Sequence, residues 1–336
     1  MVNVGVIGIG YWGPNMVRNF VANPKTNVLY CSDLRKERLN FVTSLYPKVK
    51  TTADYNEIIK DPAVDAVVIC TPVFTHYEIA RNALKSEKHV LIEKPMTSTT
   101  AEAEELINLA EQKNLKIMVD HTFLYTGAVI KIKDLIDSGK VGNLYYFNSV
   151  RVNLGLFQHD VNVIWDLAPH DISIMDFVIP HHAEAVVATG ADHVGNGLED
   201  VAYLTVYYPD NIISHIHVNW LSPVKIRQTL IGGTKKMVVW DDNDPSEKIK
   251  IYDKGIEVIK TADQVYDTLI QYRTGDMHCP KVPQTEALAL EVDEFAECIL
   301  NDAKSISDGQ LGYDVVQILE ASEKSIKNRG MEVKLT

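Results

Sequence analysis

The amino-acid sequence predicts an α/β fold in two parts: an N-terminal Rossmann domain with a doubly wound parallel sheet, and a C-terminal α+β domain with a large, mostly antiparallel, open-faced sheet. The first observation is length, because 336 residues exceed what one hydrophobic core usually serves. The second is the strand–helix alternation over residues 1–121, which is typical of a parallel sheet covered on both faces. The third is an apolar–polar alternation of period two from 184 to 260, which indicates antiparallel strands. We therefore expect domains at 1–121 and 122–336.

In the first domain, short apolar runs rich in β-branched residues alternate with segments of helical spacing. The runs predict strands at Val2–Ile7, Val28–Cys31, Ala66–Cys70, His89–Ile92 and Lys116–Val119. The helical spacing predicts helices at Trp12–Val21, His76–Ser86 and Thr100–Lys113. This order implies parallel strands joined by helical crossovers.

In the second domain, helices flank a series of strands. Helices are expected at Ala128–Ser138, Trp165–Val178, Glu286–Leu300 and Tyr313–Lys327, the last a candidate to pack back on the first domain. Strands are expected at Tyr145–Asn153, Ala185–Thr189, Val201–Tyr208, Ile212–Trp220, Ile226–Ile231, Met237–Trp240 and Lys248–Tyr252. The sheet carries Tyr203, Tyr207, Ile216 and Trp220 on or near its faces, so we expect a partner subunit to cover it in a homodimer or homotetramer.

Composition excludes several classes of protein. The net charge of −12 disfavours nucleic-acid binding, which needs a basic face. No apolar run approaches the roughly 18 residues of a membrane span, so no membrane association is expected. The four cysteines form no C-x-x-C pair and are expected to be reduced. With no basic flank or cleavage-type segment at the N-terminus, a cytoplasmic location is expected.

A glycine-rich turn follows the first strand. Gly8-x-Gly10-x-x-Gly13 opens a helix, and Asp33 ends the second strand, as the dinucleotide fingerprint requires. Asp33 would accept hydrogen bonds from ribose hydroxyls and repel a 2′-phosphate, so NAD is favoured over NADP, although Arg35 is near enough to complicate that preference. The alternative is a glycine-rich turn in a Rossmann fold that binds another molecule or none.

Polar residues also end the next two strands. Cys70-Thr71-Pro72 lies where dinucleotides run in doubly wound folds, and His76 follows as either a cofactor contact or a first-turn helix residue. Glu93-Lys94-Pro95 places a lysine at the exit of an apolar strand, held by a proline. Beside a nicotinamide this lysine would stabilise a developing alkoxide, whereas by itself it reads as a solvated strand-end charge.

A dense polar segment lies in the second domain. Asp166 and His170, within Trp165–Asp171, are four residues apart and so share one helix face. A histidine beside a carboxylate is a candidate proton acceptor. The same spacing serves metal ligands, but no third ligand lies close in sequence, and no metal is expected. An ion pair on the helix surface is the remaining interpretation.

Together these residues resemble the glucose–fructose oxidoreductase / inositol dehydrogenase (Gfo/Idh/MocA) family over essentially the whole chain. The resemblance depends on the order and spacing of four motifs: Gly8-x-Gly10-x-x-Gly13, Thr71-Pro72-x-x-x-His76, Glu93-Lys94-Pro95 and Asp166-x-x-x-His170. It implies a tightly bound nicotinamide cofactor, an open-faced sheet that often mediates oligomers, and Lys94, Asp166 and His170 at the reaction centre. It also implies a cis bond before Pro95 that aims Lys94 into a cleft between the domains.

Two segments resemble one branch of that family more closely. Gly10-Tyr11-Trp12-Gly13-Pro14-Asn15 and Trp165–Asp171 look like the branch of nucleotide-sugar and surface-polysaccharide pathways. Its members oxidise the 3-hydroxyl of UDP-N-acetylglucosamine-type sugars or their uronates. Two segments depart from the family: Asp120-His121-Thr122 replaces an Asn-x-Arg-type segment, and Glu286-Ala287-Leu288 replaces Glu-Pro-Leu. The first departure puts family cofactor contacts at that loop in doubt.

The motifs and the resemblance give an expected site. Cofactor contacts are expected from Gly8, Gly10, Tyr11, Trp12, Gly13, Asp33, Leu34, Cys70, Thr71, Pro72, His76, Glu93, Lys94 and Trp165. Substrate contacts are expected from Lys94, Arg151, Asn153, Asp166 and His170. Arg151 and Asn153 share one face of their strand and are candidates to hold an anionic substrate.

The expected reaction is hydride transfer between NAD and a secondary alcohol of a sugar. His170 would take the hydroxyl proton, Lys94 would stabilise the oxygen, and Asp166 would orient the pair; whether His170 or Lys94 is the base stays open. Three alternatives remain: reduction of a keto-sugar, oxidation of a free polyol such as an inositol, and a non-catalytic dinucleotide-binding protein. The presence of all three side chains argues against the last.

Overall fold

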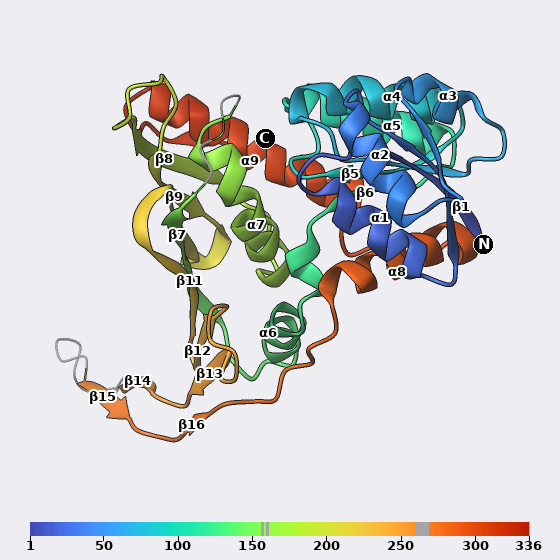
Figure 1. Cartoon of the computed structure of the whole chain (residues 1–336). Coiled ribbons are helices and arrows are strands. Elements are labelled where there is room, and N and C mark those ends of the chain that lie inside the picture. The colour runs from blue at the N-terminus through green and yellow to red at the C-terminus, as the bar shows by residue number, and fades with distance from the viewer. Residues whose placement is uncertain (156–157, 159–160, 260–268, 336) are drawn as a thin grey trace. The chain divides into compact units, whose positions relative to one another are not determined.

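The structure, a computed structural model, describes residues 1–155, 158, 161–259 and 269–335. The chain forms two compact units (Figure 1). Unit 1 comprises Met1–Thr126 and Thr285–Glu320, and unit 2 comprises Gly127–Gln284 and Ala321–Thr336. The division after Thr126 falls near the expected one after residue 121. The assignment of 285–320 to the first unit differs from the expected boundaries.

A six-stranded parallel sheet forms the centre of unit 1. Its strand order is β3-β2-β1-β4-β5-β6. The strands are β1 (Val2–Ile7), β2 (Thr26–Ser32), β3 (Lys50–Thr52), β4 (Ala66–Ile69), β5 (His89–Glu93) and β6 (Ile117–Asp120). The order reverses at β1, so the switch point of this doubly wound sheet lies at the carboxyl ends of β1 and β4. The predicted Rossmann fold is confirmed.

The helices in the first segment of unit 1, Met1–Thr126, are close to those expected, with two additions. They are α1 (Gly13–Ala22), α2 (Lys36–Leu45), α3 (Tyr55–Lys60), α4 (His76–Lys85) and α5 (Thr100–Gln112). Two single 3₁₀ turns, η1 (Val73–Thr75) and η2 (Thr122–Tyr125), follow β4 and β6. Three elements, α2, α3 and β3, were not predicted from the sequence. Because α2 buries only Val42 and β3 has three residues, neither produces a clear apolar period.

The helix α8 (Ala287–Asn301) explains why residues 285–320 belong to unit 1. Its apolar face packs into the core built around β1 and α1, where Figure 1 shows α1 and α8 side by side. Phe20 and Phe295 meet edge to face with ring centroids 6.2 Å apart. The helix α9 (Gly309–Lys327) contributes Gly309–Glu320 to unit 1 and its remainder to unit 2.

Unit 2 contains a nine-stranded mixed sheet in the order β16-β13-β12-β11-β7-β10-β9-β8-β17. One parallel pair, β7–β10, lies among antiparallel neighbours, which confirms the mostly antiparallel sheet. The strands are β7 (Leu144–Leu154), β8 (Ala185–Ala191), β9 (Val201–Tyr207), β10 (Ile213–Asn219), β11 (Leu221–Gly233), β12 (Met237–Asp241), β13 (Ile249–Tyr252), β16 (Met277–His278) and β17 (Val333–Lys334). A separate pair, β14 (Gly255–Ile259) with β15 (Leu269–Arg273), was not predicted.

The helices α6 (Gly127–Asp137) and α7 (Val163–Val178) belong to unit 2, and α7 lies against one face of the sheet (Figure 1). Ile216 and Trp220, at 1% and 0% exposure, are buried. Tyr203 and Tyr207, at 54% and 37% exposure, lie on the opposite side, which we call the outer face. Of the four side chains expected on or near the faces of the sheet, two therefore lie on its buried face and two on its solvent-exposed outer face. Within the described residues, no helix combines the length and apolarity needed to span a bilayer.

Candidate active site

The glycine-rich turn joins β1 to α1, and its three glycines differ in what surrounds them. Gly8 has φ +93°, and a Cβ there would lie 2.7 Å from the Cys70 carbonyl carbon. A Cβ on Gly13 would lie 2.2 Å from the Gly8 oxygen. A Cβ on Gly10 would meet no heavy atom nearer than Arg35 Nη2 at 3.9 Å. The fold therefore requires Gly8 and Gly13, whereas Gly10 leaves an open cradle at the start of α1, where backbone N–H groups favour an anion.

Asp33 follows β2 and faces this turn. It is 9% exposed, and its carboxylate accepts hydrogen bonds from the Ile9 N–H at 2.8 Å and the Arg35 N–H at 2.9 Å. The Arg35 guanidinium adds contacts of 3.1 and 3.3 Å. Burial raises the pKa of Asp33, but these hydrogen bonds outweigh it, so the pKa lies below its usual value. The carboxylate is therefore ionised where the fingerprint places the adenosine ribose.

Three further side chains near the turn are in different environments. Tyr11 and Leu34 are 85% and 90% exposed, so both side chains are accessible to a bound molecule. Trp12 is half-buried and donates its indole N–H to Asp120 at the end of β6. With the open cradle at Gly10 and the ionised Asp33, this edge of unit 1 fits a dinucleotide.

His76 links two loops at the same edge of the sheet. Its ring is 1% exposed, and its Nδ1 and Nε2 lie 2.9 Å from the Pro95 carbonyl oxygen and 2.8 Å from the Thr71 carbonyl oxygen. Burial lowers its pKa despite these backbone partners, so the ring is neutral near pH 7. The residue begins α4, as one of the two interpretations expected. Because a neutral imidazole has one N–H, its ring donates to one of the two carbonyl groups and lies between the loop after β4 and the loop that carries Lys94.

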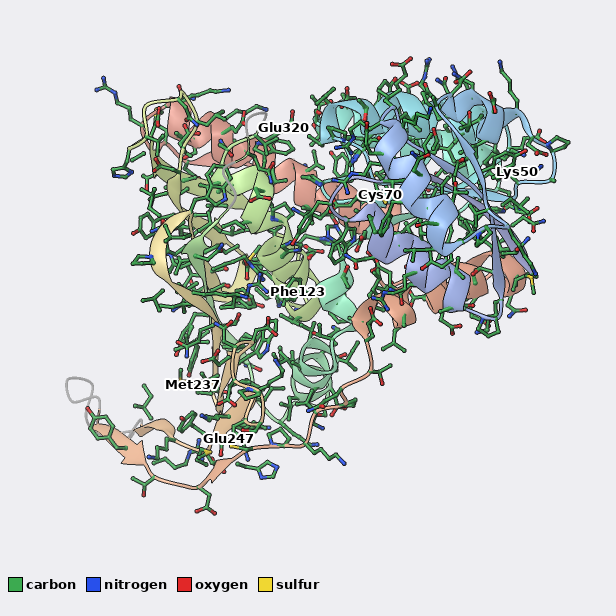
Figure 2. The ribbon with its side chains drawn as sticks, in the orientation of Figure 1. Lys50, Cys70, Phe123, Met237, Glu247 and Glu320 are labelled. Atoms are coloured by element: carbon green, nitrogen blue, oxygen red, sulfur yellow. The ribbon has the colours of Figure 1, made fainter. Side chains whose placement is uncertain are left out.

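The second loop contains Glu93, Lys94 and Pro95 at the end of β5, with a cis bond between Lys94 and Pro95. Both Glu93 and Lys94 are half-buried. The charge of Lys94 acts to lower the pKa of His76, Asp120 and His121, so these three side chains belong to the electrostatic surroundings of the lysine. Cys70, labelled in Figure 2, lies nearby and is half-buried; burial, then Asp120 and Glu93, raise the pKa of its thiol. An ammonium group at this strand end can donate to an oxygen atom of a bound molecule.

The sequence analysis noted Asp120-His121-Thr122 only as a departure from the family. The structure shows that Asp120 and His121 are 2% and 1% exposed beside Lys94. Burial, followed by the charge of Lys94, lowers the pKa of His121 to about 3, so its ring is neutral. Glu291 of α8, at 0% exposure, joins this group. The sequence feature that could have indicated this buried group is Glu291 itself, because it is a glutamate on the apolar face of α8, between Leu288 and Val292.

In unit 2, Asp166 and His170 lie on α7, and both are half-buried. Asn162 caps the helix by accepting from Ile164 and Trp165 N–H groups. Asp166 accepts the indole N–H of Trp220 at 3.0 Å, which fixes its carboxylate. Within the described residues, no group of three or more His, Cys, Asp or Glu side chains is arranged to hold a metal ion. Lys94 belongs to unit 1, and Asp166 and His170 belong to unit 2.

Trp165 and Arg151, two other expected contact residues, have partners within unit 2. The indole N–H of Trp165 donates to Glu323 at 2.7 Å. The Arg151 guanidinium contacts Asp171 of α7 at 2.5 and 3.3 Å, and both side chains are less than a twentieth exposed. Ser149 donates to the same carboxylate at 2.6 Å. The Arg151 guanidinium is therefore paired with a buried carboxylate, whereas a residue that binds an anionic substrate needs a side chain that the substrate can reach. Asn153, two residues further along β7, is half-exposed.

Comparison with known families finds both parts of this architecture. Residues 2–121 match GFO_IDH_MocA, described as an oxidoreductase family with an NAD-binding Rossmann fold. Residues 129–239 match the C-terminal domain of the same family, GFO_IDH_MocA_C3. The first match covers the sheet with the glycine-rich turn, and the second covers α7 and most strands of the mixed sheet.

Individual relatives match over nearly the full length. The scyllo-inositol 2-dehydrogenase (NAD(+)) of Bacillus subtilis (strain 168) is 23% identical over 349 residues, covering 99% of this chain and 96% of that protein. The structure of UDP-N-acetylglucosamine 3-dehydrogenase GnnA from Acidithiobacillus ferrooxidans has a TM-score of 0.81 at 22% identity, covering 97% and 98% of the two chains. GenD2 from gentamicin A biosynthesis, solved with NAD, has a TM-score of 0.84 at 19% identity, covering 100% and 96%. The likeness to these structures shows a shared fold.

Proposed function

Because the chain belongs to the Gfo/Idh/MocA family of NAD-dependent oxidoreductases that act on CH–OH groups, we propose that it transfers a hydride between NAD and a secondary hydroxyl, at C3, of a nucleotide-linked sugar. The sugar is a UDP-N-acetylhexosamine or its uronate. The observation that carries the proposal is that one chain combines an open glycine cradle for the dinucleotide with Lys94, Asp166 and His170. The 3-hydroxyl specificity named for GnnA supports the position of the reaction.

Residues of unit 1 would hold the cofactor. The N-terminus of α1 at Gly10–Gly13 takes the pyrophosphate, and Asp33 takes the ribose hydroxyls. Exposed Tyr11 and Leu34 flank the adenosine end. When bound, the nicotinamide supplies the hydride chemistry, and the protein contributes position and electrostatics.

Three side chains act on the reacting alcohol. His170 accepts the hydroxyl proton, while the Lys94 ammonium donates to the oxygen and stabilises the negative charge that develops there. Asp166, whose carboxylate accepts a hydrogen bond from the Trp220 indole, orients the His170 side chain.

A nucleotide sugar also needs contacts for its diphosphate. Arg227 of β11 is paired directly opposite Arg151 of β7, so both side chains lie on the face of the sheet that packs against α7. Arg227 is about one-third exposed and lies 3.6 Å from Asp242, whereas Arg151 is buried, so an anion in solvent can reach Arg227 more readily than Arg151. We assign Arg227 and Asn153 to substrate binding on the sheet. The same proposal places the enzyme in cytoplasmic polysaccharide biosynthesis as a homodimer or homotetramer built on the outer face.

A second candidate function is oxidation of a free inositol or related polyol, favoured by the scyllo-inositol dehydrogenase relative. Reduction of a keto-sugar would use the same residues in the opposite direction. The purified chain can be tested by following NADH absorbance with UDP- and dTDP-sugars and with free polyols. The proposal predicts NADH formation with nucleotide sugars and none with free polyols; the reverse result would identify a polyol dehydrogenase.

A further inference from the structure

Asp120 receives hydrogen bonds from two sides at the end of β6. Its Oδ2 accepts the indole N–H of Trp12, from the glycine-rich turn, and its Oδ1 accepts the hydroxyl of Thr122. The carboxylate is 2% exposed. A buried carboxylate with two donors is stabilised as the ionised form.

Glu291 of α8 lies within hydrogen-bond reach of Asp120 and is fully buried. Among the described residues, neither of its carboxyl oxygens has a hydrogen-bond partner in good geometry, although the Thr122 hydroxyl, which donates to Asp120, also acts on Glu291. Two ionised carboxylates in contact would repel each other in a medium of low dielectric. One proton between them removes this repulsion. Because Trp12 and Thr122 already donate to Asp120, the proton resides on Glu291, which donates to Asp120.

The titration directions agree with this assignment. Burial, followed by the charge of Asp120, raises the pKa of Glu291 well above its usual value. Burial also raises the pKa of Asp120; hydrogen bonds from Thr122, Glu291 and Trp12 oppose that rise without cancelling it, so this pKa too lies above its usual value. The two carboxyl groups, which we call the acid pair, therefore carry one proton and one negative charge near pH 7.

Asp120, one member of the acid pair, is acted on by the charge of Lys94. The other titratable groups around the lysine are His76 of α4, His121 after β6, Glu93 of β5 and Cys70 after β4. Burial keeps both histidines neutral and the thiol protonated. Asp120 is therefore the buried negative charge that acts on the ammonium group from β6, with Glu93 on its own strand.

Building on the proposed function, we propose that the acid pair is a positioning device: it shares one proton, and its single negative charge fixes the Lys94 ammonium group relative to the glycine-rich turn. Trp12 connects Asp120 to the turn that holds the cofactor, and Lys94 donates to the reacting oxygen. Asp120 and Glu291 touch neither cofactor nor substrate in this account and act through Lys94 and Trp12.

The shared proton can be tested without any substrate. At about pH 8, where an ordinary glutamate is ionised, infrared spectra of the purified chain should contain the carbonyl band of a protonated carboxylic acid. Glu291→Gln should remove this band, whereas Glu297→Gln, a half-exposed glutamate on the same helix, should leave it. A wild-type spectrum without the band, or a band that survives in Glu291→Gln, would overturn the proposal.

The pH dependence of the melting temperature is a second test for the proton on Glu291. A raised folded pKa means that protonated Glu291 stabilises the fold below its unfolded pKa of about 4.3 and that this stability is lost as the pH rises through the folded pKa. Glu291→Gln removes this titration but keeps an N–H donor for Asp120. Its melting temperature should therefore fall less than that of the wild type between about pH 5 and 9. Parallel curves for the two proteins would contradict the acid pair.

The link to Lys94 is tested by kinetics. Asp120→Asn removes the charge but keeps the shape, and it should lower kcat by about 10²-fold through displacement of Lys94, with KM and NADH affinity changing far less. The matched control is Asp65→Asn, which removes an equal charge from a carboxylate at the opposite edge of the sheet. Equal kcat in Asp120→Asn and wild type would refute the positioning role. If no sugar gives turnover while the infrared band is present, the proposed function fails and the acid pair stands.

Discussion

Arg35 holds Asp33 through its guanidinium, with Nε at 3.1 Å and Nη2 at 3.3 Å from the carboxylate oxygens. The arginine side chain is 55% exposed, whereas the aspartate is 7% exposed. The ion pair therefore leaves the carboxylate fixed toward the glycine-rich turn and the cation toward solvent. This relationship resolves the ambiguity that Arg35 introduces into cofactor preference, because the negative group is the one held at the ribose position.

We predict that the chain binds NADH more tightly than NADPH by at least about tenfold, which corresponds to about 1.4 kcal/mol. Asp33 would repel a 2′-phosphate, since both groups are negative. Asp33→Ser should remove the repulsion, free Arg35 and improve NADPH binding. Fluorescence titrations with both dinucleotides measure this, with Arg35→Met as the control that removes the cation alone. NADPH binding equal to NADH binding in the wild type would show that Arg35 dominates.

Lys94 and His170 are predicted to contribute to the rate of hydride transfer and not to the affinity for the cofactor. Lys94→Met keeps the chain length without charge or donors, and His170→Asn keeps polarity without a titratable base. Each should lower kcat by about 10²–10⁴-fold. NADH affinity and melting temperature should change little, because the glycine-rich turn and Asp33 are intact. Single-turnover rates, NADH titrations and melting curves on the same preparations separate the two effects; variants that lose stability but keep their turnover per folded molecule would show a structural role.

The buried Arg151–Asp171 pair yields a prediction about stability. Arg151→Met leaves a buried carboxylate without its cation and should lower the free energy of unfolding by about 3–5 kcal/mol. Arg151→Met with Asp171→Leu should recover much of the loss, because no buried charge remains. Arg227→Met, at a half-exposed pair with Asp242, should cost at most about 1 kcal/mol. Denaturant unfolding measures all three; a rise in KM without loss of stability in Arg151→Met would instead assign Arg151 to the substrate.

The outer face of the mixed sheet is predicted to be an interface between copies of this chain. Tyr203 stacks on His217, with ring centroids 4.4 Å apart, and Ile226 lies on the same face at 39% exposure. Light scattering at micromolar concentration should give a dimer or tetramer for the wild type. Tyr203→Glu with Ile226→Glu should reduce the mass to that of a monomer, since two buried charges oppose association. Val194→Glu, on an exposed loop, is the control; a monomeric wild type would exclude this interface.

Local patterns predicted most elements because burial and periodicity coincide in them. β1 has the bounds that its apolar run predicts, and α7 begins at Val163, two residues before Trp165 and directly after the helix cap Asn162. The pairing of α8 with the first core could not be predicted, because an apolar stripe shows that a helix is buried but not against what. The same limit concealed the acid pair: Asp120 and Glu291 are remote in sequence and only the fold brings them together. The pairing of Arg151 with Asp171 could not be predicted either, because the two residues lie on different elements that only the fold brings into contact.

The transfer of the sugar hydrogen itself tests the central claim most directly. A UDP-N-acetylhexosamine with deuterium at C3 is incubated with the purified chain and NAD, and the reduced cofactor is analysed by mass spectrometry, beside a matched sample labelled at C4. Hydride transfer from the C3 carbinol predicts deuterium in the reduced nicotinamide from the first sample and none from the second. Reduced cofactor without deuterium from the C3-labelled sugar, or with deuterium from the C4-labelled one, would contradict the account.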